Sequence, residues 1–463
     1  MKKFFAIILS SIIFFSTHSC VLAEKNPTAV PNNKFGIHIN NENELKDASL
    51  LVNSTEGDWG YVTFVITEAE RNHDRWQQTF DQMRRLHLIP IVRIATKVDG
   101  DNWQIPNNAE INNWIAFLNS LNWVIQNRYV IIGNEPNHSK EWGGKIDPAS
   151  YATYLSEFAE KLHQASGDFF VLPAGLDASA KNTKDTMDEA VFIDRMMNTE
   201  SKLFDHLDGW TSHSYPNPDF SGEVTDTGRG SVNTFNWELN YLRSLGIYKD
   251  LPIFITETGW SNEKVDSEKI SGMYDYAFKN IWNDKRVVAV TPFILNYPNP
   301  PFSEFSWKKS DGSFYPYYEE YKKISKIKGT PIQIESGQII GALAQPILLK
   351  ESDFVGMVLA KNTGQSIWSA NNTKVVSDDG SLTFKNNLLF DIEPTRTGLI
   401  IFRASTEQNR GILIKSVYLA NQDGKRITNS FSIEGLIVKA DKMQIQSFFA
   451  RIGGYLRSVI KGP

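Results

Sequence analysis

Eight short apolar runs separated by longer amphipathic stretches are the feature that most limits the fold of this chain. The runs are rich in Val, Ile and Phe and span residues 35–39, 61–67, 89–95, 129–135, 169–175, 207–215, 252–257 and 287–295. Strand-type runs that alternate with helix-period stretches predict parallel strands covered on both faces. Eight such units predict an α/β fold in which the strands close into a (β/α)8 barrel.

Polar side chains gather where these runs end, and the starts of the runs show no comparable cluster. The residues at the run ends are Arg93, Asn134, Glu135, Asp177, His213, Tyr215, Glu257, Asn296 and Tyr297. In a (β/α)8 barrel the loops that follow the strands build the active face, and the opposite face is structural. The asymmetry therefore predicts a functional site at the carboxyl ends of the strands.

Two of the runs end in a glutamate, in Ile132-Gly-Asn-Glu-Pro-Asn137 and Phe254-Ile-Thr-Glu-Thr-Gly-Trp260. Burying a carboxylate is costly unless it is paired, hydrogen-bonded or used in chemistry. Two carboxylates on one face can supply the acid and the nucleophile that cleave a glycosidic bond. We predict that Glu135 and Glu257 are catalytic; the alternative is that each is an ordinary salt-bridge partner.

The arrangement resembles the retaining, two-glutamate barrels of glycoside hydrolase clan A, and specifically its cellulase-like members. The resemblance rests on Asn134-Glu135-Pro136 in the fourth run and on Glu257 in the seventh, and it covers residues 35–325. It implies that Glu135 is the general acid/base and that Glu257 is the nucleophile. It also implies that Asn134 binds the sugar 2-hydroxyl.

The same resemblance suggests further substrate-binding residues. It implies that His213 and Tyr215 hydrogen-bond the nucleophile and keep it charged, although His213 also fits a purely structural role. Arg93 is expected to act on the nucleophile in the same way, or else to form an ion pair at the barrel mouth. Clan members more often carry an arginine on the second strand, so the position of Arg93 departs from their pattern.

The sequence does not decide which aromatic side chain forms the platform for the sugar. Clan members usually place a Trp at the end of the eighth strand, whereas here that run leads to Tyr297, and Trp307 follows. Either residue is expected to form the floor of the subsite next to the scissile bond. Trp260, Trp103 and Trp142 each fit two interpretations, a sugar platform or a packing residue.

The chain carries no motif for a cofactor or a metal. Its eight histidines include no His-x-x-x-His pair, and no Gly-rich phosphate loop follows a strand. The formal net charge of −5 leaves no basic stripe for a nucleic acid. We therefore expect a carbohydrate substrate, no metal, no cofactor and no nucleic-acid partner, while the oligomeric state is open.

The first residues are typical of a secretory signal. Lys2 and Lys3 precede an apolar stretch over 4–15, and Val21-Leu22-Ala23 offers small residues for cleavage after Ala23. We predict a signal peptide over 1–23 and an exported mature protein. Cys20 is a less favoured lipid-attachment site, because Thr17-His18-Ser19 is a poor lipobox.

The pattern changes after residue 330, where short β-type runs alternate with turns. This predicts a barrel over 24–330 and an antiparallel β-sandwich over 331–439. The stretch from Asn362 to Trp368 resembles a strand-turn-strand feature of immunoglobulin-like modules in bacterial surface proteins. The sandwich fits either a spacer, which we favour, or a carbohydrate-binding module.

The last segment, 440–463, predicts an amphipathic helix. Its apolar residues include Ile445, Phe448 and Phe449, and basic residues such as Lys442 and Arg451 accompany them. Such a helix suits either a peripheral contact with a membrane or cell surface, or packing on a neighbouring domain.

Taken together, these features predict an exported retaining β-glycosidase. One alternative is a saccharide-binding or adhesion protein without turnover, although binding alone does not need both glutamates. The other is a transglycosylase, which uses the same residues and transfers the glycosyl group to a sugar instead of to water.

Overall fold

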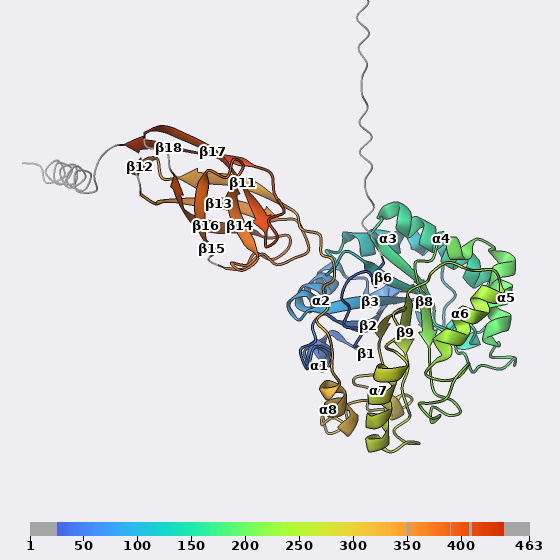
Figure 1. Ribbon diagram of the computed structural model, residues 1–463. Helices are drawn as coiled ribbons and strands as arrows, with labels where there is room; N and C mark the ends of the chain where they lie inside the picture. The colour runs from blue at the N-terminus through green and yellow to red at the C-terminus, as the bar shows by residue number, and fades with distance from the viewer. Residues whose placement is uncertain (1–25, 350–351, 389, 407–409, 439–463) are drawn as a thin grey trace, which may run out of the picture.

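A computed structural model describes residues 26–349, 352–388, 390–406 and 410–438. A parallel α/β region comes first, and an all-β region follows it (Figure 1). Within the described residues, eight parallel strands form the first region: β1 (Gly36–His38), β2 (Gly60–Thr67), β3 (Leu88–Ala95), β6 (Arg128–Ile132), β7 (Phe169–Pro173), β8 (Trp210–His213), β9 (Ile253–Glu257) and β10 (Val287–Val290). One helix follows each strand: α1 (Leu45–Val52), α2 (His73–Arg85), α3 (Ile111–Ser120), α4 (Pro148–Ala165), α5 (Glu189–Thr199), α6 (Thr234–Ser244), α7 (Ser267–Asn280) and α8 (Pro316–Lys323).

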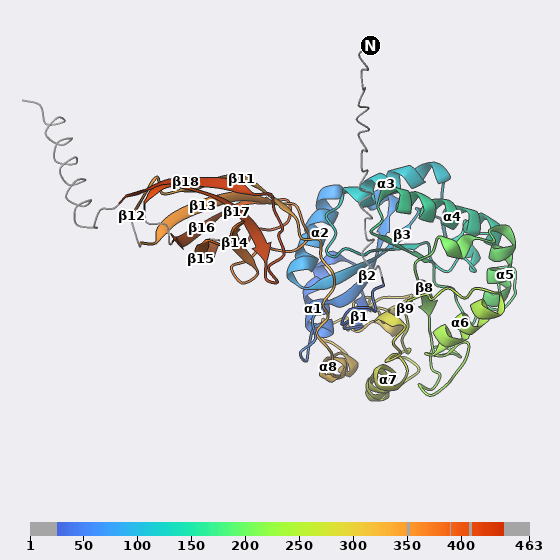
Figure 2. The same ribbon diagram turned by 45° about the horizontal axis from the view of Figure 1, so that its top comes forward.

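The eight strands form a closed ring. They pair in the orders β1-β2-β3-β6-β7 and β10-β9-β8, and parallel bridges at Phe35–Val290 and Asp177–His213 join the two sheets at both edges. Helices α1 to α8 lie around the strands (Figure 2). The α/β fold predicted from the sequence is therefore confirmed, with the predicted runs on the observed strands.

The strand sequences explain why the ring is filled. Nearly every residue of β2, β3, β6 and β7 is buried, because one face of each strand meets the barrel interior and the other meets helices. Helix α4 shows the matching pattern, with Tyr151, Leu155 and Phe158 on its buried side. Its start is fixed by Asp147, which accepts a hydrogen bond from the Ser150 N–H at 3.0 Å.

Several strands end before the predicted runs do, and β6 and β10 differ most from the prediction. β6 stops at Ile132, because Gly133 turns the backbone with a φ of +89° and removes the next residues from the ladder. β10 stops at Val290, two residues before Pro292, which has no N–H to donate. Asn134 and Glu135 therefore lie in the loop after β6.

The all-β region has two packed sheets. Its strands are β11 (Gly337–Ala344), β12 (Ile347–Leu349), β13 (Phe354–Asn362), β14 (Thr373–Ser377), β15 (Leu382–Leu388), β16 (Thr397–Thr406), β17 (Gly411–Asn421) and β18 (Phe431–Val438). They form sheets in the orders β11-β13-β16-β15 and β12-β18-β17-β14. All pairs are antiparallel except β12 with β18. Residues of β13 alternate between buried and exposed, as in a sandwich with one core face per sheet.

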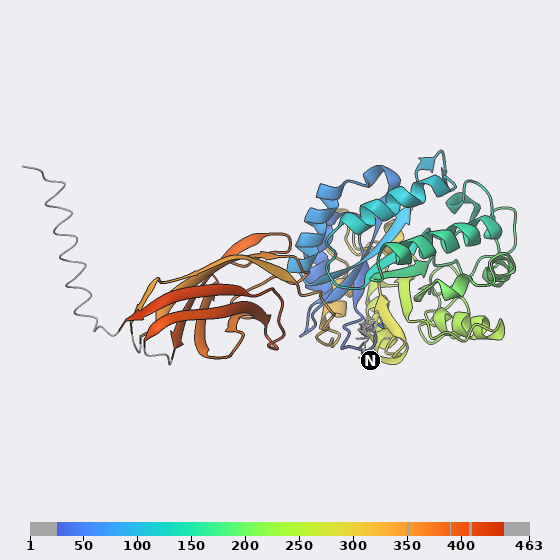
Figure 3. The ribbon, with the colours of Figure 1, turned by 90° about the horizontal axis from the view of Figure 1, so that it is seen from above.

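The sandwich contacts the barrel next to α2 (Figure 3). The buried Gln365 donates from Nε2 to the Ile125 carbonyl at 2.9 Å, and Asn122 Nδ2 donates to the Gly364 carbonyl at 3.0 Å. These bonds use the stretch from Asn362 to Trp368, so that stretch joins the two regions.

No helix in the described part of the chain has the length and apolar character needed to cross a membrane. The predicted signal peptide over 1–23 and the predicted helix over 440–463 lie outside the described residues.

Candidate active site

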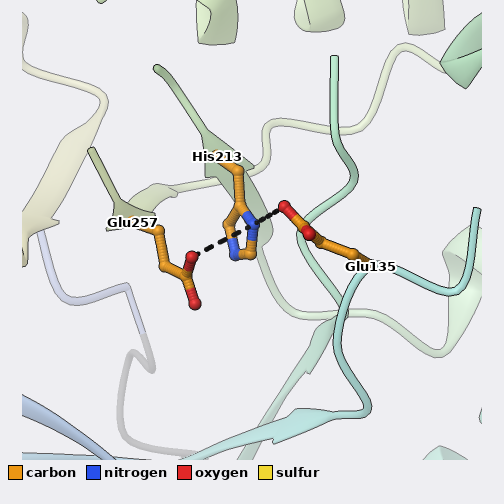
Figure 4. Close-up of side chains that lie close together, drawn as sticks. All are labelled: Glu135, His213 and Glu257. Atoms are coloured by element: carbon orange, nitrogen blue, oxygen red, sulfur yellow. Dashed lines mark hydrogen bonds and ion pairs between the residues drawn. The ribbon is translucent and has the colours of Figure 1, made fainter. Parts of the chain in front are cut away.

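The structure brings the two predicted catalytic glutamates together at the carboxyl ends of the strands. Glu257 is the last residue of β9, Glu135 lies in the loop after β6, and His213 stands between them at the end of β8 (Figure 4). His213 Nδ1 lies 2.7 Å from Glu135 Oε1 and 3.7 Å from Glu257 Oε2. One carboxylate oxygen of each glutamate lies within 4.8 Å of the other.

The backbone around Glu135 is held in an uncommon conformation. Glu135 has a φ of +31°, which a residue with a side chain rarely adopts. Its N–H donates to the Gly175 carbonyl at 3.0 Å, and its carbonyl accepts from the His138 N–H at 2.8 Å. Strained backbone that is fixed in this way is common at functional sites, where it aims a side chain.

Both oxygens of Glu257 have a donor. Arg93, from β3, donates from one guanidinium nitrogen to Glu257 Oε1 at 3.0 Å, and the Tyr215 hydroxyl donates to Oε2 at 3.1 Å. The same Arg93 nitrogen also donates to Asn134 Oδ1. Arg93, His213 and Tyr215 therefore contact one or both of the two glutamates, and Asn134 contacts Arg93.

These contacts separate the charges of the site. Burial raises the pKa of Glu257, but His213 and Arg93 outweigh it, so the pKa is lowered overall. Burial lowers the pKa of His213, but the Glu257 and Glu135 carboxylates outweigh it and raise the pKa above its ordinary value. The arrangement favours an ionised Glu257 beside a protonated His213.

A third carboxyl group, which the sequence analysis did not single out, lies next to Asn134. This residue, Glu141, ends a short 3-10 helix (Ser139–Glu141) that comes after Glu135 in the chain. Its side chain hydrogen-bonds the Asn134 side chain. Burial raises the pKa of Glu141 to about 7. In the same loop, His138 Nε2 lies 2.8 Å from Asp177 Oδ2.

A cavity of about 310 Å³ opens beside the catalytic cluster. Its lining residues include His38, Glu42, Glu70, Arg75, Trp76, Arg93, Trp103, Phe293, Tyr297 and Phe302. Tyr297 and Trp103 thus face open space, as a sugar platform requires. His38 was missed by the sequence analysis; the one signal in the sequence was a histidine at the end of the first apolar run.

Three of the predicted aromatic candidates do not face that cavity. Trp260 is 3% exposed, and its indole N–H donates to the Gly222 carbonyl at 2.9 Å. Trp307 is 1% exposed and packs against the ring of Tyr274. Trp142 is buried as well. These three rings fill the core because large aromatic side chains gain more from full burial than from one exposed face. Of the two residues expected to form the floor of the subsite next to the scissile bond, only Tyr297 lines this cavity.

Glu135, His213 and Glu257 also have the ligand types and spacing to hold a divalent cation. In this arrangement, however, the Arg93 guanidinium already lies 3.0 Å from Glu257 Oε1, and His213 favours a proton. A guanidinium and a protonated imidazole repel a metal cation, so the geometry suits acid/base chemistry better than metal binding.

No protein-family model matches the chain, and neither does any curated protein. Several solved clan A glycoside hydrolases match its structure. A family 39 glycoside hydrolase from Bacteroides cellulosilyticus is 13% identical, with a TM-score of 0.45 and 82% of each chain covered. A GH5_18 protein from Streptomyces cattleya is 11% identical, with a TM-score of 0.46, 69% of this chain and 85% of that chain covered. A GH128 endo-β-1,3-glucanase from Pseudomonas viridiflava is 14% identical, with a TM-score of 0.41, 63% of this chain and 97% of that chain covered.

Proposed function

We propose that this protein is a retaining β-glycosidase that hydrolyses an oligo- or polysaccharide. The observation that carries the proposal is the pair of carboxylates, whose oxygens approach within 4.8 Å across one face of the barrel. Retaining enzymes hold their two carboxyl groups about 5–5.5 Å apart, whereas inverting enzymes need about 6.5–9.5 Å to admit a water. Oxygens that approach within 4.8 Å are compatible with the shorter, retaining spacing, and this supports direct attack on the sugar by one of the two groups.

Glu257 is the nucleophile in this proposal. Its ionised carboxylate attacks the anomeric carbon as the bond to the leaving oxygen breaks, which forms a covalent glycosyl-enzyme. Arg93 and Tyr215 donate to its two oxygens, so they hold the carboxylate in one orientation and keep it charged. Because both donors stay in place when the ester forms, they also orient it for the second step.

Glu135 is the general acid and then the general base. It gives a proton to the leaving oxygen in the first step and removes a proton from the attacking water in the second. His213 Nδ1 lies 2.7 Å from Glu135 Oε1, a distance at which a proton can pass between the two groups. In this proposal Asn134, whose Oδ1 accepts from Arg93, donates its amide N–H to the sugar 2-hydroxyl.

The test is activity of residues 24–463 on a panel of β-linked oligo- and polysaccharides, with products identified by mass spectrometry. Glu135→Gln and Glu257→Gln are expected to lose at least a thousandfold in kcat, while Glu160→Gln on the exposed side of α4 stays at wild-type activity. Azide added to Glu257→Ala is expected to yield a glycosyl azide of inverted anomeric configuration. Unchanged turnover in either catalytic variant contradicts the assignment.

The same panel distinguishes the alternatives. Products longer than the substrate identify a transglycosylase, because a sugar then accepts the glycosyl group. Saccharide binding by calorimetry without any turnover identifies a binding or adhesion protein. Chelation with EDTA is expected to leave turnover unchanged, since the proposed mechanism uses no metal.

Export and surface contact are further parts of the proposal. They are supported by the sequence of 1–23, with its two lysines and apolar run, and by the apolar and basic residues of 440–463. N-terminal sequencing of the secreted protein is expected to find residue 24 first. Flotation with anionic vesicles is expected to retain the full chain and not a chain that ends at residue 439. Limited proteolysis near residue 330 tests the proposed boundary between barrel and sandwich.

A further inference from the structure

The outer face of one sheet of the sandwich is rich in apolar side chains. Sheet β11-β13-β16-β15 buries alternate residues in the sandwich core, so the residues between them point outward. The outward apolar residues are Leu343 of β11, Val355, Met357 and Leu359 of β13, and Leu399 and Ile401 of β16. Leu343 is 67% exposed, and the three residues of β13 are each 39% exposed. We call this surface the β13 face.

The strand register joins these side chains into one patch. Leu343 lies opposite Met357, and Met357 lies opposite Ile401. In a neighbouring row, Leu359 lies opposite Leu399. Residues that oppose each other in antiparallel strands have Cβ atoms about 4.5–5.5 Å apart, so their side chains touch across the strands. A contiguous exposed apolar patch of this kind marks a site of interaction.

The charges on the β13 face are all positive. Arg403 lies between Val355 and Lys385 in one row, and Lys361 points outward near the other end of β13. These three basic residues are exposed, and none of them forms an ion pair with a carboxylate in the described part of the chain. The sequences of β11, β13, β15 and β16 contain no Asp or Glu, although the whole chain has a formal net charge of −5. The β13 face therefore suits an anionic partner.

The outer face of the other sheet has a different charge pattern. Ile414 of β17 is 60% exposed, but Glu434 of β18 lies directly opposite it and is exposed as well. An anionic surface that approached this face would be repelled by that carboxylate. The two faces thus share exposed apolar residues and differ in charge, which makes the second face a natural control.

The pattern of the β13 face fits a lipid surface better than a second copy of the chain. In a symmetric dimer the same patch meets itself, so the basic residues of one copy would face those of the other without any carboxylate between them. An anionic membrane interface accepts both features, because apolar side chains enter the headgroup boundary and lysine and arginine bind the anionic headgroups.

We propose that the β13 face binds an anionic lipid surface, with Met357 and its apolar neighbours in the headgroup boundary and Arg403, Lys385 and Lys361 on the headgroups. The inference goes beyond the proposed glycosidase function, because it gives the sandwich a partner of its own. One weak anchor binds a membrane only marginally. The β13 face and the proposed contact through 440–463 therefore act together.

The first test places a fluorophore on each face. Residues 24–463 contain no cysteine, so Met357→Cys can carry a polarity-sensitive dye at a single site, and Ile414→Cys is the matched control. We expect the emission at position 357 to shift to the blue when vesicles of phosphatidylglycerol and phosphatidylcholine are added at low salt. Position 414 should show no shift. High salt should reverse the shift at position 357, since it screens the headgroup charges.

The second test measures partition of residues 24–463 onto the same vesicles by flotation. Met357→Asp is expected to lower the partition coefficient by about tenfold or more, because it removes apolar burial and adds a negative charge. The double variant Lys385→Gln/Arg403→Gln should lower it by about fivefold for each cation removed. Ile414→Asp should match the wild type. All these positions are exposed, and thermal unfolding checks that each variant is folded.

The outcomes separate this inference from the proposed glycosidase. Dye signals that shift equally at positions 357 and 414, or at neither, overturn the lipid contact of the β13 face. A mass of two chains in solution that Met357→Asp reduces to one assigns the face to a second copy and also overturns the proposal. The vesicle assays use no saccharide, so an absence of glycoside turnover overturns the glycosidase and leaves the lipid contact standing.

Discussion

Glu44 links the stability of the cavity wall to pH. It closes the 3-10 turn (Glu42–Glu44) after β1, where its carboxylate accepts from the Asn40 N–H at 3.2 Å and from Asn41 Nδ2 at 3.1 Å. Burial raises its pKa from 4.5 to about 7, and the two donors only partly offset that effect. The loop that carries Asn40 and Asn41 lines the same cavity as His38.

The size and sign of the effect follow from this pKa. Each pKa unit corresponds to about 1.4 kcal/mol, so ionised Glu44 lowers the free energy of unfolding by about 3 kcal/mol relative to protonated Glu44. The pKa of Glu44 is higher in the folded than in the unfolded state. The stability that protonated Glu44 gives relative to ionised Glu44 is therefore fully present below about pH 4.5, and it is lost as the pH rises to about 7. Above about pH 7 the loss is complete and constant.

The perturbation is Glu44→Gln, which removes the ionisation and keeps the size of the side chain. Between pH 4 and pH 8, the free energy of unfolding of the variant is expected to rise by about 3 kcal/mol relative to that of the wild type. The reason is that Glu44 ionises in this range and the glutamine of the variant does not. Differential scanning calorimetry of both proteins across this range measures the gain, with Glu160→Gln, an exposed glutamate on α4, as the matched control. A difference between variant and wild type that is the same at pH 4 and pH 8 would refute the reasoning.

Three further predictions concern the site and the junction between the two regions. In Gly175→Ala the new Cβ would lie 2.2 Å from His213 Cδ2, so we expect displacement of the imidazole and a fall of at least tenfold in kcat/KM on the substrate that the panel identifies. Tyr215→Phe removes the donor to Glu257 Oε2, and steady-state kinetics should show a ten- to hundredfold lower kcat, as for a hydrogen bond to a charged group of about 1.5–3 kcal/mol; an unchanged kcat would show that Arg93 alone holds the nucleophile. Gln365→Ala leaves the Ile125 carbonyl of the barrel and the Ile334 N–H of the sandwich without their partner. Thermal unfolding should show a loss of about 1–3 kcal/mol in the free energy of unfolding for each group. An unchanged unfolding midpoint would mean that water replaces the amide.

The sequence predicts the barrel well because its signal is repeated and local. Each strand run is apolar on both faces, and each helix repeats its apolar positions, so eight weak indications agree with one another. Strand ends are predicted less well. Gly133 and Pro292 set the ends of β6 and β10, and these single residues lie inside runs that are otherwise continuous.

Aromatic roles could not be assigned from the sequence. A tryptophan in an exit loop looks the same whether it stacks on sugar or packs on the core, and only the fold shows that Trp260 and Trp307 are enclosed while Tyr297 and Trp103 face the cavity. His38 was hidden for a related reason. Its ring is notable because it lacks partners, and a missing partner is a property of three-dimensional surroundings rather than of the chain.

The position of Arg93 shows how a departure from the clan A pattern has a chemical consequence. Arg93 lies on β3, which pairs directly with β6, so its guanidinium reaches the Asn134 loop as well as Glu257 across the barrel. Because β3 lies between β2 and β6, an arginine on β2 would be one strand farther from Asn134. One cation therefore fixes both the residue that is proposed to bind the sugar 2-hydroxyl and the carboxylate proposed to attack the neighbouring carbon. In the proposed mechanism these two groups act on adjacent atoms of one sugar ring. Binding both to the same guanidinium would set their spacing before the substrate arrives, and such preorganisation lowers a reaction barrier.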